Sequence, residues 1–190
     1  IENNKPRIVS LSPAMTEMLH GAGLSSFIVG RSAFCRRAMD APVIGDLAQV
    51  IIERLVRVSP THIFIQRSDE DLPAGVEELA VDHGWAIINQ HISHFADVQS
   101  LLFNIGIAFP SAQTACMDSS NAIREALRSR GRTNGPSVLV LGGGPHPLAW
   151  GSQTYLGELV EAAGGRNLID GRSWITLSLE EIVRAQPDLI

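Results

Sequence analysis

The sequence predicts an α/β protein of two lobes, each with a parallel sheet covered by helices, and with a helical connector between the lobes. Three observations predict this class. A stretch of the first half of the chain recurs near its end, short apolar runs precede helix-like segments, and a long middle segment has only helical periodicity. Apolar, β-branched runs without alternation are typical of parallel strands that helices cover on both faces.

The recurring stretch occupies residues 53–63 and again residues 180–190, and the two copies align without a gap. Identical residues in the two copies are the pairs Glu53/Glu180, Val56/Val183, Arg57/Arg184, Pro60/Pro187 and Ile63/Ile190. Further upstream, residues 17–23 are echoed by residues 158–164, and each of these segments follows a strand-like run, at 7–11 and at 137–141. The chain therefore holds two copies of one α/β unit.

The first copy is expected to run as strand (7–11), tight loop, helix, second strand, second helix and third strand (63–65), followed by a helix at 76–83 and a strand at 85–89. Gly23, Gly84 and Gly164 are predicted helix ends, because glycine readily adopts the left-handed backbone that closes a helix. The second copy stops at Ile190, where the first copy continues. We therefore expect the second lobe to be incomplete in this chain.

Residues 95 to 130 carry two apolar stripes at helical spacing, interrupted by Pro110. We expect an N-terminal α/β lobe at 1–94, a connecting helix at 95–131 and a partial C-terminal α/β lobe at 132–190. A single stiff helix between two lobes permits only a small rocking motion between them.

Composition excludes several classes of protein. The 190 residues include 15 Lys and Arg against 20 Asp and Glu, for a net charge of −5, and only 5% are aromatic. A chain with this balance and no basic cluster is not a dedicated nucleic-acid binder. No apolar stretch approaches the length of about 20 residues that spans a bilayer.

Because the chain begins at Ile1, we expect that a targeting segment or leading piece was removed. The two cysteines, Cys35 and Cys116, permit an oxidising compartment but do not indicate one.

Several motifs together resemble the helical-backbone (class III) periplasmic substrate-binding proteins of ABC importers. They are residues 6–13 followed by Thr16-Glu17, the tripeptide 44–46, residues 155–167 and residues 178–187. Within that family the chain looks most like the cobalamin-binding members, with siderophore and haem binders next. The resemblance covers residues 6–190 and implies that the two lobes clamp a ligand at the carboxyl ends of their parallel strands. It also implies a further section after the point where this chain ends.

The resemblance places several residues at the ligand. In the first lobe these are Ser12, Pro13 and Phe34 together with the loop Gly45-Asp46-Leu47, and in the second lobe Trp174, which lies in a polar stretch predicted to be a loop. Ser12 and Pro13 also have an independent local role, since serine before proline predicts a helix N-cap followed by the first helical position. His146 and Trp150 follow a strand and the triple glycine 142–144, which serves either a tight turn or backbone approach to a ligand.

Catalytic and metal chemistry are not indicated. The triple glycine does not match G-x-G-x-x-G, and Pro145 lacks the amide that a phosphate cradle needs. His91 and His94 could share a metal ion, but no carboxylate or cysteine completes a ligand set nearby, so solvated loop histidines are favoured. No nucleophile, base and orienting group occur together. We therefore predict a protein that is not an enzyme and has no catalytic residues, metal ligands or cofactor.

Glu53 and Glu180 occupy equivalent positions in the two copies. On the helix of the first copy Ile52, Leu55 and Val56 are expected to be buried, so Glu53 projects outward, and Glu180 does the same in the second copy. A solvated helix face explains either glutamate alone. By resemblance they match the glutamates with which cobalamin-type binding proteins dock onto arginines of a two-fold symmetric permease.

The sequence thus predicts the extracytoplasmic substrate-binding component of an ABC importer, periplasmic and either free or lipid-anchored. It would bind a cobalamin-like corrinoid or an iron chelate between its lobes and meet the membrane only through the permease or an anchor, with no nucleic-acid partner. Two alternatives remain open at this point. One is an intracellular α/β nucleotide-binding domain or enzyme that uses the 142–144 loop, and the other is a shortened homologue that no longer binds a ligand.

Overall fold

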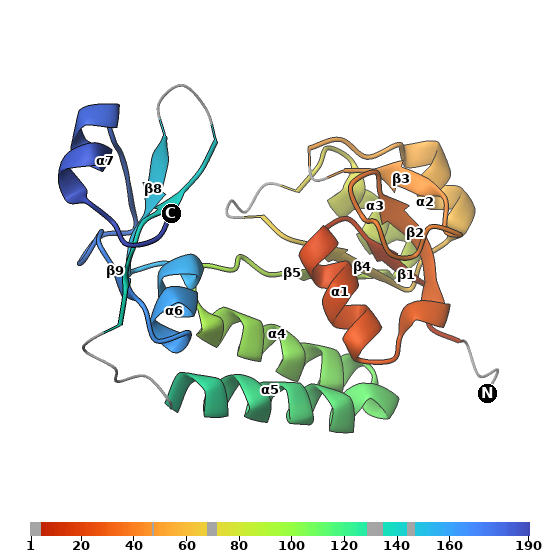
Figure 1. Cartoon of the computed structure of the whole chain (residues 1–190). Coiled ribbons are helices and arrows are strands. Elements are labelled where there is room, and N and C mark those ends of the chain that lie inside the picture. The colour runs from red at the N-terminus through yellow and green to blue at the C-terminus, as the bar shows by residue number, and fades with distance from the viewer. Residues whose placement is uncertain (1–4, 47, 68–71, 129–134, 144–146) are drawn as a thin grey trace. The chain divides into compact units, whose positions relative to one another are not determined.

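A computed structural model describes residues 5–46, 48–67, 72–128, 135–143 and 147–190 (Figure 1). The chain forms two compact units. The first unit takes in residues up to 91 and residues 101–117, and the second takes in residues 92–100 and 118–190. The helical segment predicted at 95–131 is two helices, α4 (Phe95–Ala108) and α5 (Gln113–Arg128), with a short 3-10 turn at Pro110–Ala112. Each of these helices contributes residues to both units.

The first unit is a five-stranded parallel sheet in the order β3-β2-β1-β4-β5. The strands are β1 (Ile8–Ser10), β2 (Ile28–Ser32), β3 (Val43–Gly45), β4 (His62–Ile65) and β5 (Ala86–Asn89). Its helices are α1 (Pro13–Gly21), α2 (Ile52–Val58) and α3 (Val76–His83), and a 3-10 turn lies at Ser25–Phe27. Because all strands are parallel, the loops after them emerge at one edge of the sheet, where ligands of α/β proteins bind.

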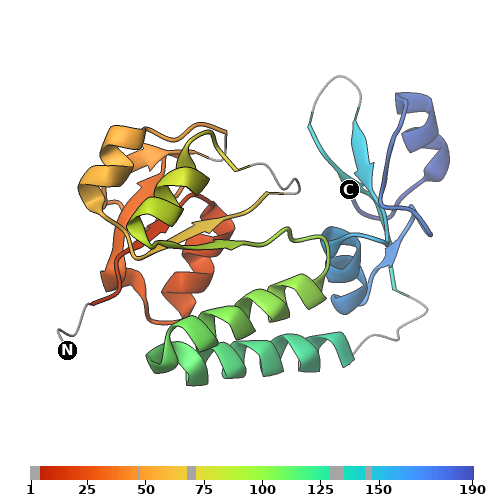
Figure 2. The same cartoon turned by 180° about the vertical axis from the view of Figure 1, so that it is seen from behind.

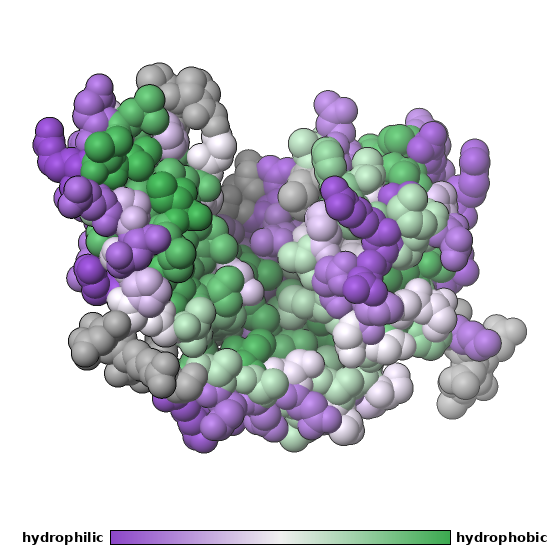
Figure 3. All heavy atoms as spheres, in the orientation of Figure 1, coloured by the Kyte–Doolittle hydropathy of each residue, from purple (hydrophilic) through white to green (hydrophobic). Residues whose placement is uncertain are grey.

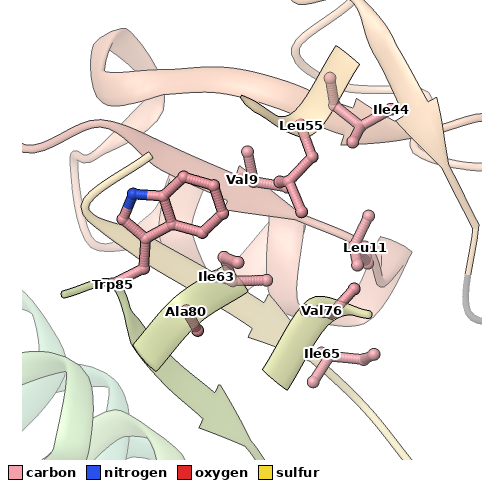
Figure 4. Close-up of a cluster of buried hydrophobic side chains, with 9 residues drawn as sticks. All are labelled: Val9, Leu11, Ile44, Leu55, Ile63, Ile65, Val76, Ala80 and Trp85. Atoms are coloured by element: carbon pink, nitrogen blue, oxygen red, sulfur yellow. The ribbon is translucent and has the colours of Figure 1, made fainter. Parts of the chain in front are cut away.

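Helices cover both faces of this sheet, as Figures 1 and 2 show, with α1 on one face and α2 and α3 on the other. The core against α2 and α3 is drawn in Figure 4 and consists of Val9, Leu11, Ile44, Leu55, Ile63, Ile65, Val76, Ala80 and Trp85. The opposite face meets α1, where the Thr16 hydroxyl donates to Ser10 Oγ at 2.8 Å, and meets Phe109, whose ring lies 6.2 Å from that of Phe64. Burial on both faces explains why the strands read as continuous apolar runs.

The second unit contains a short parallel sheet and an antiparallel one. The parallel pair is β6 (Ser137–Val138) with β9 (Arg166–Asn167), and helix α6 (Tyr155–Ala162) lies between them in sequence. The antiparallel sheet has the order β10-β8-β7, formed by β7 (Val140–Leu141), β8 (Leu148–Trp150) and β10 (Trp174–Thr176). Helix α7 (Leu179–Ala185) follows. The core of the second unit is built around Leu139, Ala149 and Leu177.

The internal repeat is confirmed by matching backbone contacts within each unit. In the first unit the amides of Thr61 and His62 donate to the carbonyl of Arg7 at 2.8 and 3.2 Å. In the second, the amides of Asp188 and Leu189 donate to the carbonyl of Ser137, both at 3.0 Å. Each contact pairs the end of the repeated stretch, in parallel, with the first strand of its own unit.

The helices of the repeat also agree residue for residue. Helices α2 and α7 both have seven residues, and each is closed by a non-glycine residue in the left-handed region, Ser59 at φ 42° and Gln186 at φ 45°. Helices α1 and α6 each end two residues before a left-handed glycine, Gly23 and Gly164. The predicted helix ends at these glycines, and at Gly84 after α3, are therefore confirmed.

One strand prediction differs from the structure. The run 137–141 was expected to form a single strand, but it is divided at Leu139 into β6 and β7. The Leu139 side chain is fully buried, and its amide donates to the Leu189 carbonyl at 3.0 Å. Beyond this point the chain pairs with β8 instead, and the Gly142 amide donates to the Leu148 carbonyl at 2.7 Å. The two halves of the apolar run, β6 and β7, therefore belong to two different sheets.

Candidate functional site

The two tryptophans predicted in the second lobe are brought together by the antiparallel sheet. Trp174 in β10 lies directly opposite Trp150 in β8, and Trp150 lies directly opposite Val140 in β7. Directly opposed residues of an antiparallel pair have their side chains on the same face. Both tryptophans were expected in loops, and the structure corrects this, because each belongs to a strand.

The tryptophan face points away from the core of the second unit. The neighbouring register row is Leu141, Ala149 and Ile175, and these residues pack in the core cluster. Since successive residues of a strand alternate between faces, the row with Trp150 and Trp174 lies on the other side of the sheet. Trp174 is accordingly 58% exposed. We call Val140, Trp150 and Trp174 the aromatic row.

A sheet holds the aromatic row more firmly than a loop would. Trp150 lies in the central strand, and its carbonyl accepts from Asn167 Nδ2 at 3.0 Å. Adjacent Gly151 donates from its amide to the carbonyl of Ser173 at 2.8 Å. Rigid aromatic surface of this kind binds flat apolar groups at low cost in conformational entropy.

In the first unit, Ser12 and Pro13 follow β1 at the carboxyl edge of the sheet. The predicted cap is confirmed, since Ser12 accepts from the Met15 amide and Pro13 is the first residue of α1. The Ser12 hydroxyl also donates to Gln66 Oε1 at 2.8 Å and is only 1% exposed. In this structure the hydroxyl is therefore engaged inside the protein, and Pro13 is the exposed member of the pair.

Gln66 is the residue at this edge that sequence reasoning missed. It follows β4, the neighbour of β1 in the sheet, and its amide oxygen accepts the Ser12 hydroxyl hydrogen. The signal available was a polar residue directly after the apolar run 63–65, at the strand end where ligand-binding loops emerge. The repeat could not point to Gln66, because the second copy ends before the corresponding residue.

Gly45, the last residue of β3, and Asp46 begin a tight turn. The Asp46 carboxylate accepts from the amides of Gln49 and Ala48 at 2.9 and 2.8 Å, and these hydrogen bonds lower its pKa below the usual value. Gly45 has a φ of 153°, and a Cβ at this position would overlap the carbonyl oxygen of Gln49. Both residues therefore shape the loop, and Leu47, the third residue predicted here, lies outside the described residues.

Phe34 is the exposed ring of the first unit at this edge. It follows β2, its amide donates to Ser32 Oγ at 3.1 Å, and it is 68% exposed. The preceding residue is also fixed, because the Ala33 amide donates to the Gly45 carbonyl at 2.9 Å. An apolar ring held on an anchored backbone and left in solvent is available for contact with a ligand.

The loop after β7 is described only in part. Gly142 and Gly143 do not have the positive φ that demands glycine, and a Cβ at Gly143 would meet no atom within 4 Å. A strained turn therefore does not explain these two glycines. Gly144 and His146 lie outside the described residues.

Glu53 and Glu180 are both exposed and both lie in the first turn of their helices, α2 and α7. Neither has an ion-pair partner among the residues that the structure describes. The expectation that Val56 and its counterpart Val183 would be buried is wrong, since they are 39% and 74% exposed. The side chains that reach the cores are Leu55 and Ile182, because a seven-residue helix places few positions on its inner face.

Comparison with known proteins finds similar sequences among substrate-binding proteins. No protein-family model matches the chain. An uncharacterized ABC transporter substrate-binding lipoprotein of Bacillus subtilis, YvrC, is 23% identical over the whole chain, and a vitamin B12-binding protein of Yersinia pestis is 27% identical over 97% of it. The chain spans 64% and 68% of the lengths of these two relatives.

Solved structures agree on the fold. The periplasmic haem-binding protein HutB of Vibrio cholerae matches with a TM-score of 0.80 at 21% identity, over 97% of this chain and 75% of that one. The periplasmic vitamin B12-binding protein BtuF of Vibrio cholerae matches with a TM-score of 0.73 at 16% identity, over 95% and 73%. The chain thus has the helical-backbone, class III fold and is related to the substrate-binding proteins of ABC transporters. Its relatives include proteins named as vitamin B12-binding, and its structural neighbours include proteins named as haem-binding.

Proposed function

We propose that this protein is the extracytoplasmic substrate-binding component of an ABC importer and that its ligand is a large, flat, cofactor-like molecule, a corrinoid or an iron chelate. The observation that carries the proposal is the aromatic row, in which Trp150 and Trp174 lie opposite each other on a sheet face turned away from the core. Stacking on such a face suits a ligand with a wide apolar ring face, and it offers little to an inorganic ion.

The first unit would contribute Phe34 and the loops after β1 and β3. Phe34 adds a second exposed aromatic surface, while the turns at Pro13 and Asp46 present backbone that is already fixed by hydrogen bonds. Binding to prearranged groups costs little ordering entropy, which favours capture of a scarce ligand. The relatives are binding proteins, and binding without chemical conversion is the activity proposed here.

Delivery to the importer would use Glu53 and Glu180. Each is exposed at the start of an equivalent helix, one in each unit, so a permease with two equivalent basic sites could engage both. Charged groups at such a contact favour fast association and correct register. None of the helices in the described residues is long and apolar enough to cross a membrane. The proposed location is periplasmic or otherwise extracytoplasmic, with or without a lipid anchor.

A ligand titration tests the proposal. Cyanocobalamin, haemin and a ferric siderophore are each added to the chain, and ligand absorbance and tryptophan fluorescence are followed. We expect saturable binding of one of them with quenching of tryptophan emission, and weaker binding by Trp150→Ala and Trp174→Ala. Phe103→Ala is the matched control, since Phe103 is 69% exposed on α4 and is not part of the site. Equal affinity of all four proteins would contradict the proposed site.

A further inference from the structure

A group of buried polar side chains lies in the first unit where β1 and β2 end and α1 begins. Five of the seven buried polar or charged residues that the structure describes belong to this group, namely Ser10, Ser12, Thr16, Arg31 and Ser32. Burying a polar group costs free energy unless it is hydrogen-bonded. Their concentration at one place, next to the loop that carries Phe34, therefore requires an explanation.

Arg31 is the charged member of this group. It lies in β2 and is only 8% exposed. No carboxylate forms an ion pair with it in the part of the chain that the structure describes. The charged residues that follow it, Arg36, Arg37 and Asp40, are all exposed, and Figure 3 shows hydrophilic side chains at the surface of the first unit beside α1. Charged side chains of this segment thus reach water, and Arg31 is the exception.

The Arg31 guanidinium donates to three backbone carbonyls. Nη1 donates to the carbonyl oxygens of Ser32 and Cys35 at 3.1 and 3.2 Å, and Nε donates to that of Ala41 at 3.2 Å. Among the described residues, no backbone amide donates to the carbonyls of Cys35 and Ala41. Both residues are buried, so loss of the guanidinium would leave their carbonyls unpaired. Arg31 therefore ties two points of the following segment to β2.

That segment is the loop 33–42, which carries Phe34 and contains no helix or strand. Ala38 in this loop has a φ of 62°, a left-handed conformation that a residue with a Cβ adopts at a cost. Contacts with the rest of the unit must therefore hold the loop. Cys35, directly after Phe34, is held from two sides, because its carbonyl accepts from Arg31 and its Sγ lies 3.0 Å from Thr16 Oγ1.

Arginine suits this role better than another side chain would. Its planar guanidinium carries donors that point in different directions, so that Nε and Nη1 reach carbonyls near both ends of the loop. Hydrogen bonds from a charged donor are also stronger than those from a neutral one. A lysine has a single nitrogen at its tip and does not reproduce this fork.

We infer that Arg31 is a positioning residue for ligand binding, which fixes the loop 33–42 from inside and so holds the Phe34 ring where it meets the ligand. This inference rests on the proposed function and adds a residue that does not itself touch the ligand. Phe34 is 68% exposed, so packing of its own ring does not fix it. A group that is held in place before binding loses little conformational freedom on binding, and Arg31 thus raises affinity through Phe34.

Hydrogen exchange of the ligand-free chain tests whether Arg31 holds the loop. The amides of Cys35 and Ala41 donate within the loop segment, to Ser32 and Ala38, and in Arg31→Met they should exchange about 10-fold faster or more. Amides of β4 should change much less. Arg57→Met is the matched control, at an exposed arginine on α2. Arg31→Lys keeps the charge without the fork, and it carries the test if Arg31→Met does not fold.

Ligand titration tests whether Arg31 acts through Phe34. Cyanocobalamin, haemin and a ferric siderophore are the probes. For the compound that binds, Arg31→Met should raise Kd about 5-fold in the wild-type chain but less than about 2-fold in Phe34→Ala, because nothing is left to position once the ring is removed. An arginine with a purely structural role would lower the urea midpoint and leave the Kd of the folded molecules unchanged.

The outcomes separate this inference from the proposed function. Unchanged exchange across 33–42 in Arg31→Met would overturn the inference, whatever the titration shows. An equal rise in Kd with and without Phe34 would also overturn it, because Arg31 would then act independently of the ring. Absence of binding of all three probes by the wild-type chain would contradict the proposed function and, with it, the binding role of Arg31, whereas faster exchange would still show that Arg31 holds the loop.

Discussion

Trp174→Ala is the substitution that tests the aromatic row most sharply, because the ring has much surface to offer a ligand and little role in the core. A tryptophan side chain presents about 250 Å², so a residue 58% exposed leaves roughly 145 Å² in solvent. A flat ligand on one ring face covers about half of this area, which at about 25 cal/mol per Å² is worth roughly 1.8 kcal/mol, or about 20-fold in Kd. Loss of one cross-strand partner should lower the free energy of unfolding by about 1 kcal/mol or less.

The assay pairs ligand titration with urea unfolding of the same protein samples. Trp85→Ala is the contrasting variant, since Trp85 is 9% exposed in the core of the first unit. It should lose about 3–5 kcal/mol of unfolding free energy, while the molecules that remain folded bind ligand with unchanged Kd. If Trp174→Ala instead showed a stability loss of that size together with unchanged affinity, Trp174 would belong to the core and not to a ligand site.

Three further predictions concern the first and second units separately. Burial lowers the pKa of His62 below 6.5, so near this pH the folded protein binds fewer protons than the unfolded chain. The free energy of unfolding should therefore fall as the pH drops below 6.5, and it should fall less in His62→Gln. Urea unfolding of both proteins at pH 7.5 and 5.5 measures this difference. Hydrogen bonds from Ser137 lower the pKa of Asp188 below 3.8, so Asp188→Asn should lower the urea midpoint at pH 7, and the difference should vanish as pH falls below 3.8. Ser12→Ala removes the cap of α1 and the partner of Gln66, and should cost about 1–2 kcal/mol in calorimetric unfolding without changing the secondary structure content.

Much of the fold was predictable because its signals are local or repeated. Ser12 and Pro13 predict the start of α1, and left-handed glycines follow the ends of α1, α3 and α6. The repeat correctly paired α2 with α7, and the structure shows that the two helices have equal lengths. These features depend on a few neighbouring residues, and a single sequence contains all of them.

The antiparallel sheet of the second unit was not predictable from such signals. Trp174 and Trp150 are separated by helix α6 and strand β9 in sequence, and only the strand register shows that they share a face. Each strand has three residues, too few for a period of two to be recognised. The exposure of Val183 was also missed, because the helix pattern shows which residues are apolar but not how many of them the core can accommodate.

Native mass spectrometry tests most directly the proposed binding of one large, flat cofactor-like molecule. The chain is incubated with equal concentrations of cyanocobalamin, haemin and a ferric siderophore and sprayed from volatile buffer. We expect a single adduct of one ligand per chain, which is depleted in Trp174→Ala and retained in Phe103→Ala. Unbound chain alone, or an adduct equally abundant in both variants, would contradict it.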